Sequence, residues 1–91
     1  MNDFKVETEF GYCYYSFEED YVHVYDLYVY PKFRRLGHAR ELLELAIKGI
    51  RDTGYNGDIQ IVALPRECSI SGIKLKNFYK SMGFIVFEAY L

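Results

Sequence analysis

The feature that most constrains the fold is a long extended run followed at once by a helix. Residues 21–30 are rich in β-branched and aromatic side chains, and Pro31 ends the run. Alternation places its residues on two faces, with Val22, Val24, Asp26 and Tyr28 on one and His23, Tyr25, Leu27 and Val29 on the other. Apolar residues then recur with the spacing of an amphipathic helix, at Ala39, Leu42, Leu43, Ala46, Ile47 and Ile50. These patterns predict a strand that turns directly into a helix ending before Gly54.

The remaining segments complete an order of strand, strand, strand, helix, strand, helix, strand. Besides residues 21–30, strands are predicted at residues 4–9, 12–17, 58–64 and 84–90. A second helix is predicted from about Ser69 or Ser71 to Gly83. A hairpin followed by strand–helix–strand crossovers gives an α/β (α+β) fold, with a single mixed, mainly antiparallel sheet and two flanking helices.

Composition indicates one globular domain, residues 1–91, because 51% of the chain is hydrophobic and 26% is charged. A chain this short buries a small share of its surface, so a homodimer or a large ligand could contribute to its stability. The net charge of −2 argues against general attraction to nucleic acid or to membranes. No apolar run has the length of a membrane span, and the charged N-terminus does not resemble a signal peptide, so we expect a cytoplasmic protein. Cys13 and Cys68 form neither a disulfide framework nor a zinc pattern, and no metal site is predicted.

Basic residues gather at the turn before the first helix, where Lys32, Arg34, Arg35 and Arg40 fall close together. The first N–H groups of a helix have no intrahelical partner, and the helix dipole is positive there. Gly37 would let the backbone approach a ligand closely, and arginine side chains suit phosphate oxygens. The alternative is that Gly37 is an ordinary loop glycine and that the arginines form a solvated basic surface. From these residues alone, the turn predicts a site for a phosphate-bearing ligand.

Two stretches resemble signatures of the Gcn5-related N-acetyltransferase (GNAT) superfamily. The segment LYVYPKFRRLGHA, residues 27–39, is similar to its acetyl-CoA signature, a strand followed by R/Q-x-x-G-x-G/A, which Arg34, Gly37 and Ala39 match. The later NFYKSMGF, residues 77–84, resembles the second signature, an aromatic–Tyr pair followed by Gly-Phe. The resemblance extends from about Gly11 to the end of the chain and implies a compact, N-terminally shortened GNAT-like fold.

This resemblance implies an N-acetyltransferase that uses acetyl-CoA as acyl donor. Backbone N–H groups from about Arg35 to Ala39 would hold the CoA pyrophosphate, and the N–H near Val29 would polarise the thioester carbonyl. The implied acetyl-CoA-binding residues are Leu27, Tyr28, Val29, Arg34, Arg35, Leu36, Gly37, His38, Ala39 and Arg40.

The resemblance also implies two catalytic residues. Tyr79 matches a tyrosine that donates a proton to the departing CoA thiolate, although it also lies on the apolar stripe of its helix and could be a core aromatic. A lysine-type amine, with a pKa near ~10.4, must lose a proton before it attacks. His23, six residues before Val29, occupies a place where the family often has its base, and an imidazole suits that task directly or through a water. A structural histidine is the alternative reading, with Asp26 and Glu19 as fallback bases.

The chain departs from the family pattern in ways that concern the acceptor. Gly72 and Leu75 stand where the family usually has asparagine and alanine, and the first strand and two helices of typical members are missing before the hairpin. An open acceptor side favours a macromolecular acceptor, such as a lysine on another protein, and partner or dimer contacts could complete it. The segment of residues 11–20 resembles compact phage-associated members of the family.

Three rival functions remain open at this point. The first is a non-catalytic CoA-binding or protein-interaction module, including an inhibitor of a host or defence protein. The second is a small nucleic-acid binder, which the net charge disfavours. The third is a cysteine nucleophile, Cys13 or Cys68, paired with His23 or His38, although nothing in the sequence orders such a site.

Overall fold

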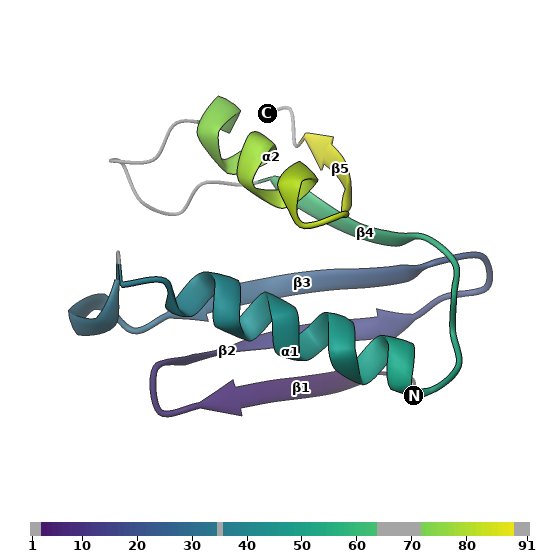
Figure 1. Cartoon of the computed structure of the whole chain (residues 1–91), viewed down its shortest axis with the longest axis horizontal. Coiled ribbons are helices and arrows are strands. Elements are labelled where there is room, and N and C mark those ends of the chain that lie inside the picture. The colour runs from purple at the N-terminus through teal and green to yellow at the C-terminus, as the bar shows by residue number, and fades with distance from the viewer. Residues whose placement is uncertain (1–2, 35, 64–71, 89–91) are drawn as a thin grey trace.

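The computed structural model of the chain describes residues 3–34, 36–63 and 72–88 (Figure 1). In chain order the elements are β1 (Asp3–Thr8), β2 (Gly11–Phe17), β3 (Val22–Val29), the 3-10 turn η1 (Pro31–Phe33), α1 (His38–Asp52), β4 (Ile59–Ala63), α2 (Gly72–Ser81) and β5 (Ile85–Glu88). The predicted order of strands and helices is confirmed, and the 3-10 turn is an addition. The predicted start of the second helix at Ser69 or Ser71 and the predicted end of the last strand lie outside the described residues.

The sheet has five strands in the order β1-β2-β3-β4-β5. β1, β2 and β3 pair in antiparallel fashion over almost their whole lengths, whereas β3 with β4 and β4 with β5 form shorter parallel pairs. The prediction of a mixed, mainly antiparallel sheet is therefore confirmed.

Both helices lie on one face of the sheet (Figure 1). α1 connects β3 to β4 and α2 connects β4 to β5, so the two crossovers step across the sheet in the same direction. Because such crossovers are almost always right-handed, two steps in one direction place both helices on the same side. Neither α1 nor α2 covers the opposite face.

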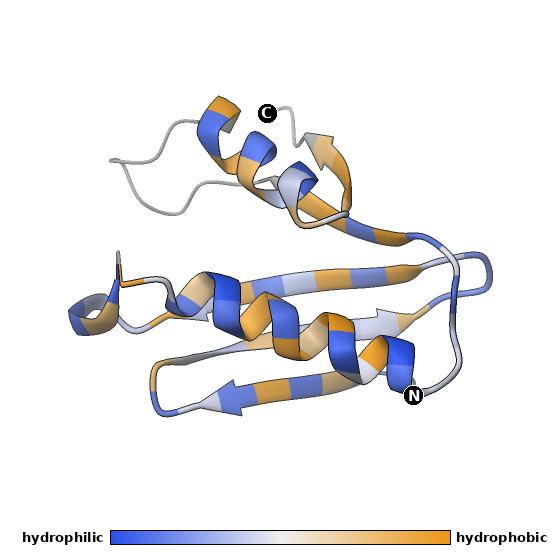
Figure 2. Cartoon of the chain, in the orientation of Figure 1, coloured by the Kyte–Doolittle hydropathy of each residue, from blue (hydrophilic) through white to orange (hydrophobic). Residues whose placement is uncertain are grey.

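The core lies between α1 and the strands. Leu42, Leu43, Ala46 and Ile50 are fully buried on the predicted stripe of α1, and the sheet supplies Cys13, Tyr15, Val22, Val24, Ile59 and Ile61. Figure 2 shows hydrophobic and hydrophilic segments alternating along α1, as expected of a helix with one buried face. Replacing a leucine in such a position by alanine typically costs ~2–5 kcal/mol. Neither described helix is long and apolar enough to cross a membrane.

Candidate functional site

A bulge interrupts β3 where the sequence predicts regular alternation. Tyr12 pairs with Tyr28 and Tyr14 pairs with Tyr25, so three steps along β3 face two along β2. Asp26 lies in this bulge with φ of 56°, and among the described residues it is the one non-glycine with a positive φ. The extra residue reverses the alternation, so that Leu27 and Val29 pack against the core, as Val22 and Val24 do. The predicted division of β3 into two faces is therefore wrong after Tyr25.

A pocket opens between β3 and β4 just beyond the last paired residues. The parallel ladder ends at Val24 and Ile61, and the pocket, of about 250 Å³, begins there. It is lined by Val24, Tyr25, Asp26 and Leu27 of β3, Ile61 and Val62 of β4, and Tyr79 of α2. The carboxyl ends of parallel strands are a common place for ligands, because neighbouring strands can diverge there.

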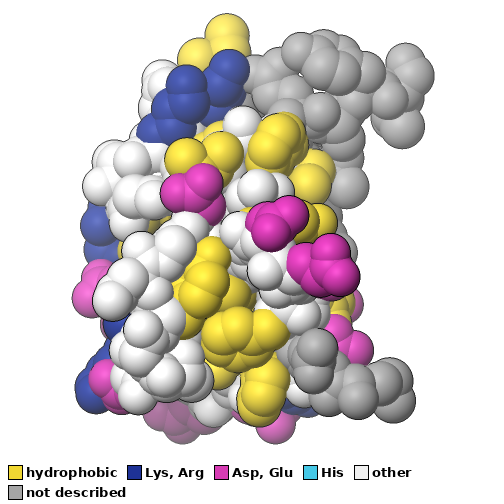
Figure 3. Space-filling view, turned by 90° about the vertical axis from the view of Figure 1, so that its right-hand side faces the viewer, with side chains coloured by type: hydrophobic (Ala, Val, Ile, Leu, Met, Phe, Trp, Pro, Cys, Tyr) yellow, Lys and Arg dark blue, Asp and Glu magenta, His cyan; other side chains and the backbone are white. Residues whose placement is uncertain are grey.

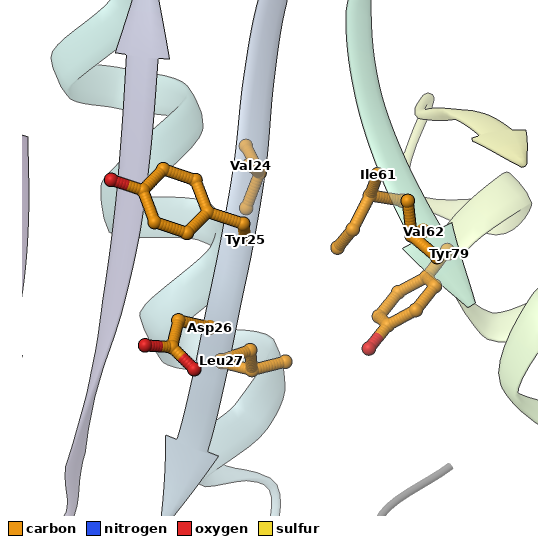
Figure 4. Close-up of a pocket in the computed structure, with 7 residues that line it drawn as sticks. All are labelled: Val24, Tyr25, Asp26, Leu27, Ile61, Val62 and Tyr79. Carbon is orange, nitrogen blue, oxygen red and sulfur yellow. The ribbon is translucent and has the colours of Figure 1, made fainter. Parts of the chain in front are cut away.

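Tyr79 is both a core residue and a wall of this pocket. Its side chain is 5% exposed, and its ring packs against Phe78 and Phe84 with centroid distances of 5.7 and 6.1 Å. Figure 4 shows its hydroxyl directed toward the gap between β3 and β4, which Leu27 also enters from β3. Because the ring is packed in the core, the position of the hydroxyl at the pocket is fixed, which suits a proton donor.

The bases predicted from the sequence take different positions. His23 stacks on Tyr25 with 5.6 Å between ring centroids, and it is not among the residues that line the pocket. Asp26, a fallback base, does line the pocket, although Figure 4 shows its carboxylate turned away from Tyr79, toward β2. Glu19 is exposed in the turn between β2 and β3. The structure thus brings Tyr79 and Asp26 to one pocket. His23 does not line this pocket, but it stacks on Tyr25, which does.

Gly37 starts α1 in a left-handed conformation, with φ of 86° and ψ of 5°. A Cβ at this position would meet nothing within 4 Å, so the backbone angle and not crowding favours glycine here. The N–H of Glu41 donates to the Gly37 carbonyl at 3.3 Å, so the N–H groups of His38, Ala39 and Arg40 precede the first intrahelical bond. These N–H groups lie at the helix start for which the sequence predicts an anion site, beside the exposed Leu36, and that site stays a prediction.

The arginines at this turn hold it in place. The Arg34 Nε donates to the Val29 carbonyl at 2.9 Å, and its guanidinium lies 5.2 Å from the centre of the Tyr28 ring. The Arg40 guanidinium lies 5.3 Å from the centre of the Phe78 ring on α2. Arg35 lies outside the described residues. Arg34 therefore ties the loop to the end of β3, and Arg40 ties α1 to α2 next to Tyr79.

His38 has a structural side chain. Its ring stacks on Phe10 with 3.6 Å between centroids, and its Nδ1 lies 3.3 Å from Oε2 of Glu41. This stack joins the start of α1 to the turn between β1 and β2. The sequence interpretation missed Phe10, and an isolated aromatic before Gly11 gives no signal of such a contact.

Cys13 does not have the chemistry of a nucleophile. Its side chain is fully buried, and burial, with the nearby charge of Asp26, raises the pKa of its thiol to about 12. The thiolate is therefore scarce at neutral pH. Cys68 lies outside the described residues, and no group of three metal-ligating side chains occurs in the described part of the chain.

Comparison with known proteins gives two matches. Residues 3–86 match the family model described as an acetyltransferase (GNAT) domain. The crystal structure of the anti-CRISPR protein AcrVA5 is similar, with a TM-score of 0.72 and 32% sequence identity, over 89% of this chain and 81% of that one. No curated protein matches the sequence.

Proposed function

Because the chain belongs to the GNAT acetyltransferase family, we propose that it transfers an acetyl group from acetyl-CoA to an amine. The amine attacks the thioester directly while both substrates are bound. The main support is the pocket between β3 and β4, which has the Tyr79 hydroxyl at its wall.

The described residues fit acetyl-CoA in two places. A pocket of about 250 Å³ can take the acetyl thioester but not the whole molecule. The ladder between β3 and β4 ends at Val24, so the backbone of Leu27, Tyr28 and Val29 runs along the gap and could hold the pantetheine arm. The N-terminus of α1, from Gly37 to Arg40, suits the pyrophosphate. Acetyl-CoA supplies the activated acyl group.

The protein's own groups would move protons around this transfer. The acceptor nitrogen forms a bond to the carbonyl carbon as the carbon–sulfur bond breaks, and Tyr79 gives its hydroxyl proton to the sulfur. The proton that the new amide nitrogen then loses returns through solvent to the Tyr79 oxygen. The ammonium of the acceptor must first lose a proton. We assign that proton to His23 acting through a water, since His23 adjoins the pocket wall at Tyr25, with Asp26 as the alternative base.

A lysine on another protein is the acceptor that we favour. One face of the sheet is left uncovered by both helices, which leaves room for a macromolecule at the pocket. The similarity to an anti-CRISPR protein supports a defence protein as the target. We place the reaction in the cytoplasm and retain a homodimer as a further proposal.

The first test compares two Tyr→Phe variants. Tyr79→Phe should lower the rate of CoA release with a lysine peptide by ~100-fold or more, because a general acid contributes on this scale, while calorimetric affinity for acetyl-CoA stays unchanged. Tyr55→Phe is the matched control, since its hydroxyl bonds the Asp58 carbonyl away from the pocket. Wild-type protein that neither binds acetyl-CoA nor releases CoA would refute the proposal. Binding without release for any amine would favour the non-catalytic module.

His23 is tested by the rate of the same reaction. His23→Ala should slow CoA release by ~100-fold, because a general base contributes on this scale, while the affinity for acetyl-CoA stays unchanged. Added imidazole should restore part of the rate. A rate equal to that of the wild type would move the base to Asp26 or Glu19.

A further inference from the structure

Tyrosine rings cover the face of the sheet that the helices leave open. The tyrosine face, as we call it here, consists of Tyr12 and Tyr14 of β2, Tyr25 and Tyr28 of β3, and Tyr30 just after β3, none of which belongs to the buried core. Neighbouring rings are in contact, with centroid distances of 5.7 Å for Tyr12 with Tyr14, for Tyr12 with Tyr28 and for Tyr14 with Tyr25. The rings are half-buried, so this face presents a continuous aromatic surface to whatever binds there.

The bulge in β3 connects the tyrosine face to the pocket. Tyr25 and Asp26 are consecutive, yet Figure 4 shows both side chains on the side of β3 that faces β2. Both also line the pocket whose far wall is Tyr79. A ligand lying on the tyrosine face would therefore reach the pocket past one aromatic ring and one carboxylate.

The tyrosine face already binds cations of its own chain. Lys5 Nζ lies 5.1 Å from the centre of the Tyr12 ring and 5.6 Å from that of Tyr14. The Arg34 guanidinium lies over Tyr28. These contacts show that the rings take ammonium and guanidinium groups in the geometry that favours cation–π attraction. Of the five rings, Tyr25 and Tyr30 have no such contact with another described residue.

Carboxylates lie at the end of the tyrosine face where β2 ends and β3 begins. Asp3 accepts a hydrogen bond from Tyr25, and burial, followed by this bond, raises the pKa of the Tyr25 hydroxyl. Glu18 accepts a bond from Ser16 at 3.0 Å at the end of β2. Figure 3 looks onto the end of the molecule that carries the turn between β2 and β3 and shows hydrophobic side chains at the surface close to acidic ones. Aromatic rings among carboxylates are complementary to a basic peptide segment.

We propose that the tyrosine face docks a basic, lysine-bearing segment of the acceptor protein, and that Tyr25 and Asp26 receive the acceptor lysine at the mouth of the pocket. This inference rests on the proposed acetyl transfer and specifies its acceptor. Flanking arginines or lysines of the segment would lie near the carboxylates of Asp3 and Glu18. Asp26 acts here as a specificity residue for the ammonium group.

The test uses two peptides of equal length with one central lysine, flanked by arginines in one and by glutamates in the other. Binding is measured by fluorescence anisotropy and transfer by CoA release, at low and at high salt. We expect the basic peptide to have at least ~10-fold higher kcat/KM at low salt, with the difference shrinking at high salt because charge attraction is screened.

Variants of the pocket mouth then locate the effect. Asp26→Asn should raise KM for the basic peptide while leaving acetyl-CoA affinity intact, whereas Asp52→Asn, an equal charge change on α1, should not. Tyr25→Leu should weaken binding of the basic peptide by about two- to fivefold, the scale of one exposed cation–π contact, and Tyr25→Phe should keep most of the affinity because it keeps the ring. Thermal unfolding of each variant checks that the fold is retained.

The outcomes separate this inference from the proposed function. Equal binding of the two peptides, or equal loss in the Asp52→Asn control, would overturn the docking surface even if acetyl transfer occurs. Selective binding of the basic peptide that Tyr25→Leu weakens, without CoA release for this peptide or for any other amine, would keep the docking surface and favour the non-catalytic module.

Discussion

Cys13 is the β2 residue opposite the bulge in β3, and its environment shows how closely the core approaches the pocket. The Cys13 thiol is fully buried, and the negative charge of Asp26 on the neighbouring strand β3 contributes to the raised pKa of this thiol. Burial is the larger cause. A neutral thiol packs here as a small apolar group, so Cys13 stabilises the strand that presents Asp26 and takes no part in the chemistry.

The raised pKa of Cys13 makes stability fall in alkaline solution. The folded-state pKa of about 12 lies above the ordinary value of 9.0, so the contribution is complete below about pH 9 and is lost as pH rises toward 12. In that window the unfolded chain loses its proton first, and the free energy of unfolding should fall by up to ~1.4 kcal/mol per pH unit from this group. Urea unfolding of the wild type and Cys13→Ala from about pH 8 to about pH 10.5 checks this, because tyrosine titration affects both alike. Parallel curves would contradict the assignment.

The sequence predicts the helix α1 well, but it does not predict the bulge in the strand β3. The spacing of Leu42, Leu43, Ala46 and Ile50 predicts α1 and its buried face, because a helix repeats the same geometry at every turn. The bulge in β3 is not predictable in this way, because it depends on how β2 pairs with β3. In the sequence alone, Asp26 is equally compatible with a strand of regular alternation. The one signal in the sequence is a carboxylate on the same predicted face as Val22 and Val24, and the bulge turns Asp26 away from that face.

Gly11 allows the end of β3 to lie against the start of β2, and replacing it should damage that element. A Cβ on Gly11 would collide with the Tyr28 carbonyl oxygen and crowd the Cα of Val29, which are backbone atoms that cannot move without shifting β3. Gly11→Ala should therefore destabilise the protein by ~2 kcal/mol or more, on the scale of overpacking in a core.

Gly49→Ala is the matched control for this strand contact. Its Cβ would meet the Tyr15 hydroxyl at 2.9 Å, the far end of a side chain, and alanine gains ~0.5–1 kcal/mol over glycine inside a helix. Denaturant unfolding of both variants should show a clear loss for Gly11→Ala and a small change for Gly49→Ala. Equal losses would mean that close packing of β2 on β3 does not set the stability of this region.

At the scale of the whole molecule, the pocket lies between two parts of the fold. β1, β2, β3 and α1 form one part, and β4, α2 and β5 form the other. Only the short ladder from Val22 to Val24 pairs β3 with β4. The two sequence signatures fall one in each part, so the sequence could predict that Gly37 and Tyr79 serve one site. It could not predict that Asp26 would line the pocket and His23 would not, because that depends on where the strands separate.

A ligand that contacts both parts should stabilise the molecule strongly. Acetyl-CoA at about 100 times its Kd adds ~2.7 kcal/mol to the free energy of unfolding, and a domain of this size gains ~4–8 °C in Tm per kcal/mol. We therefore expect the Tm of the wild type to rise by roughly 10–20 °C. At that same acetyl-CoA concentration, loss of the contact between the pyrophosphate and the start of α1 would raise the Kd and reduce the rise in Tm, which a glycine variant can test.

Gly37→Asp should lose this Tm rise, because it places a carboxylate where the pyrophosphate would lie. Gly54→Asp is the matched control: Gly54 follows α1 with φ of 93°, and a Cβ there also meets nothing within 4 Å. Both variants force a side chain into a left-handed conformation and should lower the Tm without ligand. Only Gly37→Asp should abolish the acetyl-CoA response, because Gly54 lies at the opposite end of the helix. An intact response in Gly37→Asp would remove the pyrophosphate from the start of α1, whatever the activity of the wild type.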